Sequence, residues 1–102
     1  MLPKINKNNS GEYVIEGELN NQTVPAISQK LHTLLSNADG NKITFDLALV
    51  SRSDSTGVAL LVEAMQLAKT ANLSLLFINL PQQMQDIAGI SGLLEILPIN
   101  KN

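Results

Sequence analysis

Two hydroxyl side chains stand beside a carboxylate in the short polar stretch Arg-Ser-Asp-Ser-Thr-Gly, from Arg52 to Gly57. Ser55 and Thr56 can each carry a phosphate, and Asp54 is a favourable N-cap for a helix that begins just after it. A phosphate there would lie at the positive end of the helix dipole, where Asp54 would repel it and Arg52 would offset that repulsion. Because phosphorylation adds roughly two negative charges, these residues suit a regulated contact.

Ordinary helix capping explains the same residues without any modification. Asp-Ser-Thr ahead of an apolar helix is a common N-terminal pattern, and on local chemistry alone we favour capping. Gly57 has no side chain, so we expect its backbone to be open to close approach by another group. The spacing alone does not distinguish capping from phosphorylation.

Residues suited to catalysis, metal binding or cofactor binding are scarce. The chain has no cysteine, and its one histidine, His32, is expected on the outer face of a helix, remote from Asp54 and Ser55. Four aspartates lack both the spacing of a calcium loop and the histidine partner of a zinc site: Asp39, Asp46, Asp54 and Asp86. We therefore expect a protein that is not an enzyme and that uses no cofactor.

The composition predicts an aliphatic core and argues against a polyanionic partner. Of 102 residues, 44% are hydrophobic but only 3% are aromatic, so stacking platforms for nucleic-acid bases are few. Seven basic and nine acidic residues give a formal charge of -2, which disfavours nucleic acid and anionic membranes as partners. With no signal-peptide pattern and no apolar run of about 20 residues, we expect one cytoplasmic domain over residues 1–102.

The spacing of apolar residues predicts alternating strands and helices. A turn cluster at 8–11 predicts a hairpin with its first strand at a sheet edge, and Thr23 is the expected cap of the first helix. The expected strands are 4–6, 12–19, 42–50, 74–79 and a short one near 96–99; the expected helices are about 24–36, 55–72 and 81–88. The continuous apolar run at 75–78 predicts a strand covered on both faces in the centre of a parallel sheet. The order β-β-α-β-α-β-α-β indicates an α/β fold with a mixed, mostly parallel sheet and crossover helices.

The helix expected over 55–72 has an unusually wide apolar surface. On a helical wheel, Glu63, Gln66 and Thr70 share one narrow polar wedge, while apolar residues occupy most of the remainder. One face of a sheet cannot cover such an arc. Either neighbouring helices cover the rest, or a partner protein docks there, beside the polar stretch that precedes the helix.

The region from Thr44 to Leu61 resembles the signature of STAS domains, the small α/β domains of anti-sigma factor antagonists, sulfate-transporter tails and a lipid-transporter subunit. The matching residues are Thr44-Phe45-Asp46-Leu47, Val50 and Asp54-Ser55-Thr56-Gly57-Val58-Ala59-Leu60-Leu61. The resemblance covers roughly residues 12–99 and implies a single STAS-like domain.

Within that family, the flanking residues most resemble the MlaB group, cytoplasmic subunits of phospholipid ABC transporters of the Mla type. Their motif has the form Arg-x-Asp-Thr-x-Gly, which Arg52 to Gly57 fits with Ser55 in the threonine place. The resemblance implies a non-enzymatic accessory subunit that binds the MlaF-like ATPase subunit at the inner membrane and helps to maintain outer-membrane lipid asymmetry. The implied contact residues are Arg52, Asp54, Ser55, Thr56, Gly57, Val58 and Leu61.

The anti-sigma factor antagonists are the alternative. In that group a partner kinase, itself the anti-sigma factor, phosphorylates the hydroxyl residue just before the glycine, which is Thr56 in this sequence. Two hydroxyl residues precede Gly57, so the resemblance leaves the choice between Ser55 and Thr56 open.

Overall fold

The computed structural model describes residues 3–38 and 40–100, so Asp39 lies outside the described residues. Its elements are β1 (Lys4–Lys7), β2 (Tyr13–Leu19), α1 (Val24–Ser36), β3 (Lys42–Ser53), α2 (Ser55–Thr70), β4 (Ser74–Ile78) and α3 (Gln82–Ile90). This order confirms the predicted α/β class. The predicted helix over 55–72 is present and ends two residues earlier, at Thr70.

The four strands form one mixed sheet in the order β1-β2-β3-β4. β1 pairs antiparallel with β2, as the predicted hairpin requires, whereas β2–β3 and β3–β4 are parallel pairs. The Asn8 side chain holds the hairpin turn, because its Oδ1 accepts hydrogen bonds from the backbone N–H groups of Ser10 and Glu12. The first strand lies at the sheet edge, as expected.

The position of β4 differs from the prediction. β4 lies at the opposite edge of the sheet, and its alternating exposure leaves Leu76 37% exposed while Phe77 is buried. The expected last strand is reduced to one parallel bridge between Phe77 and Ile99. Phe77 donates its N–H to Pro98 and accepts from Asn100, so residues 98–100 cover part of this edge. The apolar run at 75–78 is therefore not covered on both faces: Phe77 is buried in the core, whereas Leu76 is exposed at the edge of the sheet.

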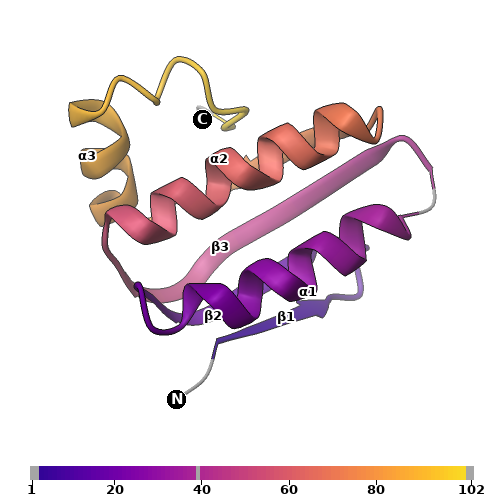
Figure 1. Ribbon diagram of the computed structural model, residues 1–102, viewed down its shortest axis with the longest axis horizontal. Coiled ribbons are helices and arrows are strands. Elements are labelled where there is room, and N and C mark those ends of the chain that lie inside the picture. The colour runs from indigo at the N-terminus through magenta and orange to yellow at the C-terminus, as the bar shows by residue number, and fades with distance from the viewer. Residues whose placement is uncertain (1–2, 39, 101–102) are drawn as a thin grey trace.

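The hydrophobic core lies between the sheet and the helices. In Figure 1, α1 and α2 run side by side across the same face of the sheet, and α3 lies beside the start of α2. Phe45 is fully buried in the middle of this face, with its ring centroid 6.0 Å from Tyr13 and 6.1 Å from Phe77. The parallel connections through α1 and α2 thus bring the ends of β2 and β3 to one end of the sheet.

The start of α1 corrects the predicted role of Thr23. Its side chain makes no capping hydrogen bond to the helix; instead its hydroxyl donates to the Glu18 carbonyl and accepts from the Asn20 N–H. Asn20 closes the turn, since its Oδ1 accepts from the N–H groups of Gln22 and Thr23. An asparagine side chain readily replaces a backbone turn in this way.

Candidate functional site

The site begins where β3 ends and α2 starts. The sequence predicted that this strand ends at residue 50, but β3 continues as a strand through Ser53. It continues because it still pairs with β2, with Arg52 beside Glu18 and Ser53 beside Leu19. Arg52 is therefore an exposed residue at the end of the strand. The corner between β3 and α2 is the single residue Asp54.

Asp54 caps α2 as predicted. Its backbone is extended, with φ -104° and ψ -166°, and its Oδ1 accepts a hydrogen bond of 2.8 Å from the Thr56 N–H. Its own N–H donates to the Leu19 carbonyl at 3.1 Å. The cap therefore joins three elements: it ends β3, starts α2 and binds the end of β2. This geometry holds the first turn of α2, and the hydroxyls of that turn, in a defined position.

Gly57 has a different role from the one expected. A Cβ atom at this position would lie 2.0 Å from the Ser53 Oγ and 3.0 Å from the Leu19 Cβ. The close approach is therefore made within the fold, between the first turn of α2 and the ends of β2 and β3. Gly57 is buried and leaves no open backbone for a partner or a phosphate.

Gln83 of α3 is a site residue that the sequence analysis missed. Its Oε1 accepts a hydrogen bond of 2.8 Å from the Ser53 N–H, and Ser53 is only 4% exposed. The Ser53 hydroxyl donates to the Asp54 carbonyl at 3.0 Å. Thirty residues separate Ser53 from Gln83, and no local pattern marks such a contact.

Replacing Gln83 with leucine removes the acceptor of a nearly buried N–H group. Because Gln83 is exposed and the bond is part-buried, water can replace the lost acceptor, so we expect the free energy of unfolding to fall by about 0.5–1.5 kcal/mol. Gln82→Leu is the matched control, because among the described residues the Gln82 side chain bonds only Asp86 of its own helix, at an exposed position. Urea unfolding of both variants tests this; an equal effect of the two substitutions would contradict the role given to Gln83.

The implied contact residues divide into exposed and buried groups. Arg52, Asp54 and Ser55 are exposed, and Thr56 is half-buried. The others are buried: Gly57, Val58 and Leu61. A partner can therefore touch the corner and the first two residues of α2 directly. The buried residues instead fix the position of α2 against the rest of the fold.

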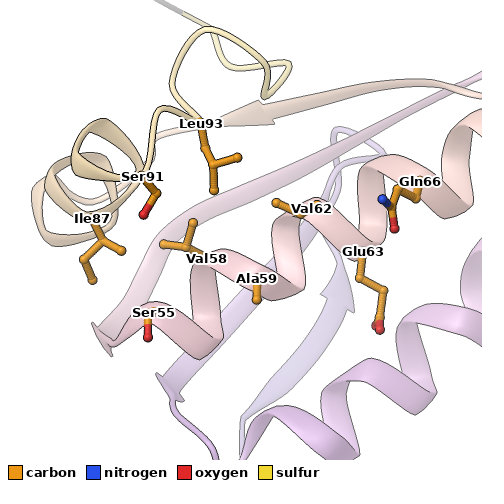
Figure 2. Close-up of a pocket in the computed structure, with 9 residues that line it drawn as sticks. All are labelled: Ser55, Val58, Ala59, Val62, Glu63, Gln66, Ile87, Ser91 and Leu93. Atoms are coloured by element: carbon orange, nitrogen blue, oxygen red, sulfur yellow. The ribbon is translucent and has the colours of Figure 1, made fainter.

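A shallow groove of about 300 Å³ begins at Ser55 and follows α2. Figure 2 shows Val58 and Val62 of α2 facing Leu93, with Ile87 and Ser91 beside the start of the groove. Each of the two explanations for the wide apolar surface of α2 therefore applies to a different part of that surface. The sheet, α1 and α3 bury most of it, while this strip stays accessible.

Glu63 connects the groove to α1. The Ser28 hydroxyl donates to the Glu63 Oε1, and the His32 Nε2 lies 3.6 Å from the same oxygen. His32 is exposed, as expected, and it contacts Glu63 of α2. It lies beside Glu63 rather than beside Asp54 and Ser55, so the three residues of a Ser-His-Asp relay are not brought together.

The comparisons agree with the fold. The family model described as "Mlab, STAS domain" matches residues 7–98. Among solved structures, the anti-sigma factor antagonist SpoIIAA in its unphosphorylated form has a TM-score of 0.72 and 20% identity, covering 98% of this chain and 89% of that chain. An anti-sigma factor antagonist from Mycobacterium paratuberculosis has a TM-score of 0.73 and 17% identity, covering 98% and 85%. No curated protein matches the chain.

A third solved structure belongs to a larger protein. The overall structure of SLC26A9 matches with a TM-score of 0.52 and 17% identity, covering 84% of this chain but 17% of that one.

In the part of this chain that the structure describes, no helix has both the length and the apolar character needed to cross a bilayer.

Proposed function

Because the chain belongs to the MlaB-type family of STAS domains, we propose that it is a non-enzymatic accessory subunit of an Mla-type phospholipid ABC transporter. It binds the cytoplasmic, MlaF-like ATPase subunit and lies at the inner membrane through that partner. The observation that carries this proposal is the match of the MlaB-type family model to residues 7–98, nearly the whole chain. In this role the protein supports the maintenance of outer-membrane lipid asymmetry.

The geometry of the corner supports a binding role. The side chains of Arg52, Ser55 and Thr56 are accessible. The backbone that carries them is fixed by the Asp54 cap and by the close packing at Gly57. A contact surface that is already ordered before binding loses little conformational entropy when a partner docks. We therefore assign the ATPase contact to the corner and the first turn of α2.

Removing the protein from its host tests this proposal. We expect the transporter purified from a deletion strain to hydrolyse ATP more slowly, or to lose its ATPase subunit, and we expect added wild-type protein to restore both. The control is a strain that expresses Gln82→Leu in place of the wild type, which alters only an exposed contact within α3. A transporter that keeps its full composition and ATP hydrolysis without the protein would contradict the proposal.

The runner-up is a partner-switch protein of the anti-sigma factor antagonist class. The structural similarity to SpoIIAA and the two hydroxyl residues before Gly57 favour it. It requires phosphate on Thr56 or Ser55 and a kinase-like anti-sigma factor as partner. Mass spectrometry of the protein isolated from its host across growth conditions measures that phosphate, and its consistent absence would count against this second function.

A further inference from the structure

The groove between α2 and α3 has an apolar floor and begins at the proposed contact. Val58, Val62, Ile87 and Leu93 line it, and Ser55, the first residue of α2, lies at its start. Figure 2 shows these side chains converging from the two sides of the groove. The groove is therefore continuous with the corner where we place the ATPase. A segment of the same ATPase can therefore reach the groove.

Glu63 is the one charged side chain among the nine described residues that line the groove. The other lining residues are uncharged. The electrostatic potential beside the groove therefore favours a basic partner and disfavours an acidic one.

One carboxylate is held at the edge of the groove. Glu63 lines it, with its side chain 39% exposed, and Figure 2 shows that side chain pointing from α2 toward α1. Ser28 and His32 both contact Oε1, and among the described residues Oε2 has no hydrogen-bond partner. Glu63 is therefore restrained by α1 while it keeps one oxygen available for a cation.

We propose that the groove receives a segment of the ATPase subunit in which an apolar side chain is followed, within a few residues, by a lysine or arginine. The apolar side chain packs between Val62 and Leu93, and the cation pairs with Glu63. This inference rests on the proposed function and specifies the chemistry of its partner. Charge complementarity at the interface sets the orientation of the segment and its rate of association.

Binding of the purified ATPase subunit from the same host, measured by calorimetry at low and at physiological salt, tests the inference. We expect Glu63→Gln to weaken binding about fivefold at low salt, with a smaller difference at physiological salt, because screening reduces the ion pair. Val62→Thr keeps the side-chain shape and is expected to weaken binding about fivefold at either salt, because a hydroxyl then enters the apolar floor. Glu12→Gln, in the hairpin, makes the same charge change far from the groove and should leave the affinity unchanged.

The outcomes separate this inference from the proposed function. If the wild type binds the ATPase but Glu63→Gln and Val62→Thr bind equally well, the groove assignment is wrong and the proposed function stands. Tighter binding by Glu63→Lys would show that the partner is acidic, which also overturns the inference. A wild-type dimer that Val62→Thr converts to a monomer would assign the groove to a second copy of this chain instead. If the wild type does not bind the ATPase, the proposed function is wrong, and this inference is wrong with it.

Discussion

Replacing Gly57 with alanine lowers the free energy of unfolding by about 1–3 kcal/mol, the usual cost of overpacking a filled core. The new Cβ meets the Ser53 Oγ at 2.0 Å and the Leu19 Cβ at 3.0 Å. The hydroxyl can rotate away, but the Leu19 Cβ is attached to the backbone of a central strand. The better helix propensity of alanine, worth up to about 1 kcal/mol, offsets only part of the strain.

Two further variants distinguish a steric effect from a general effect of glycine. Gly89→Ala places its Cβ 3.3 Å from the end of the flexible Leu94 side chain, so we expect a change of less than about 1 kcal/mol. Ser53→Ala combined with Gly57→Ala removes the shorter contact and should recover part of the lost stability. Denaturant unfolding of all the variants measures this, and equal stabilities for Gly57→Ala and Gly89→Ala would refute the tight contact.

Replacing Thr56 with glutamate weakens binding to the ATPase strongly while leaving the fold intact. Thr56 is half-buried in the first turn of α2, where a negative charge is favourable to the helix dipole. The same charge would enter the contact beside Asp54, and we expect at least a tenfold loss of affinity, about 1.4 kcal/mol or more. Because we expect the fold to stay intact, the loss can be assigned to the interface.

The matched control for this prediction is Thr33→Glu. Thr33 is an exposed threonine of α1, so the substitution adds the same charge to a helix away from the corner. We expect it to keep the wild-type affinity and to support wild-type ATP hydrolysis. Full co-purification and full ATP hydrolysis with Thr56→Glu would remove Thr56 from the interface.

Local chemistry in the sequence predicted the parts of the site that depend on neighbouring residues. The Asp54 cap is such a part, since the carboxylate and the Thr56 N–H are two residues apart. The hairpin and the approximate positions of the helices follow in the same way from turn residues and apolar periodicity, although the structure ends α2 at Thr70 and α3 at Ile90. These features are determined by short stretches of chain, so a single sequence contains enough information for them.

Contacts between remote elements could not be predicted in this way. The hydrogen bond from Ser53 to Gln83 and the contact of Ser28 with Glu63 join residues 30 and 35 positions apart. The place of β4 at the sheet edge depends on which strands pair, and an apolar run such as 75–78 is compatible with either place. The role of Gly57 also depends on remote contacts, because the atoms that crowd it belong to Leu19 and Ser53 of two different strands.

Direct binding to the two candidate partners is the most decisive measurement. The chain would be co-expressed with the Mla-type ATPase of its host and, separately, with a kinase-like anti-sigma factor of the same host, and each product would be analysed by size-exclusion chromatography with mass determination. The proposed function predicts a stable complex with the ATPase and none with the anti-sigma factor. A complex with the anti-sigma factor alone, together with phosphate on Ser55 or Thr56, would contradict it.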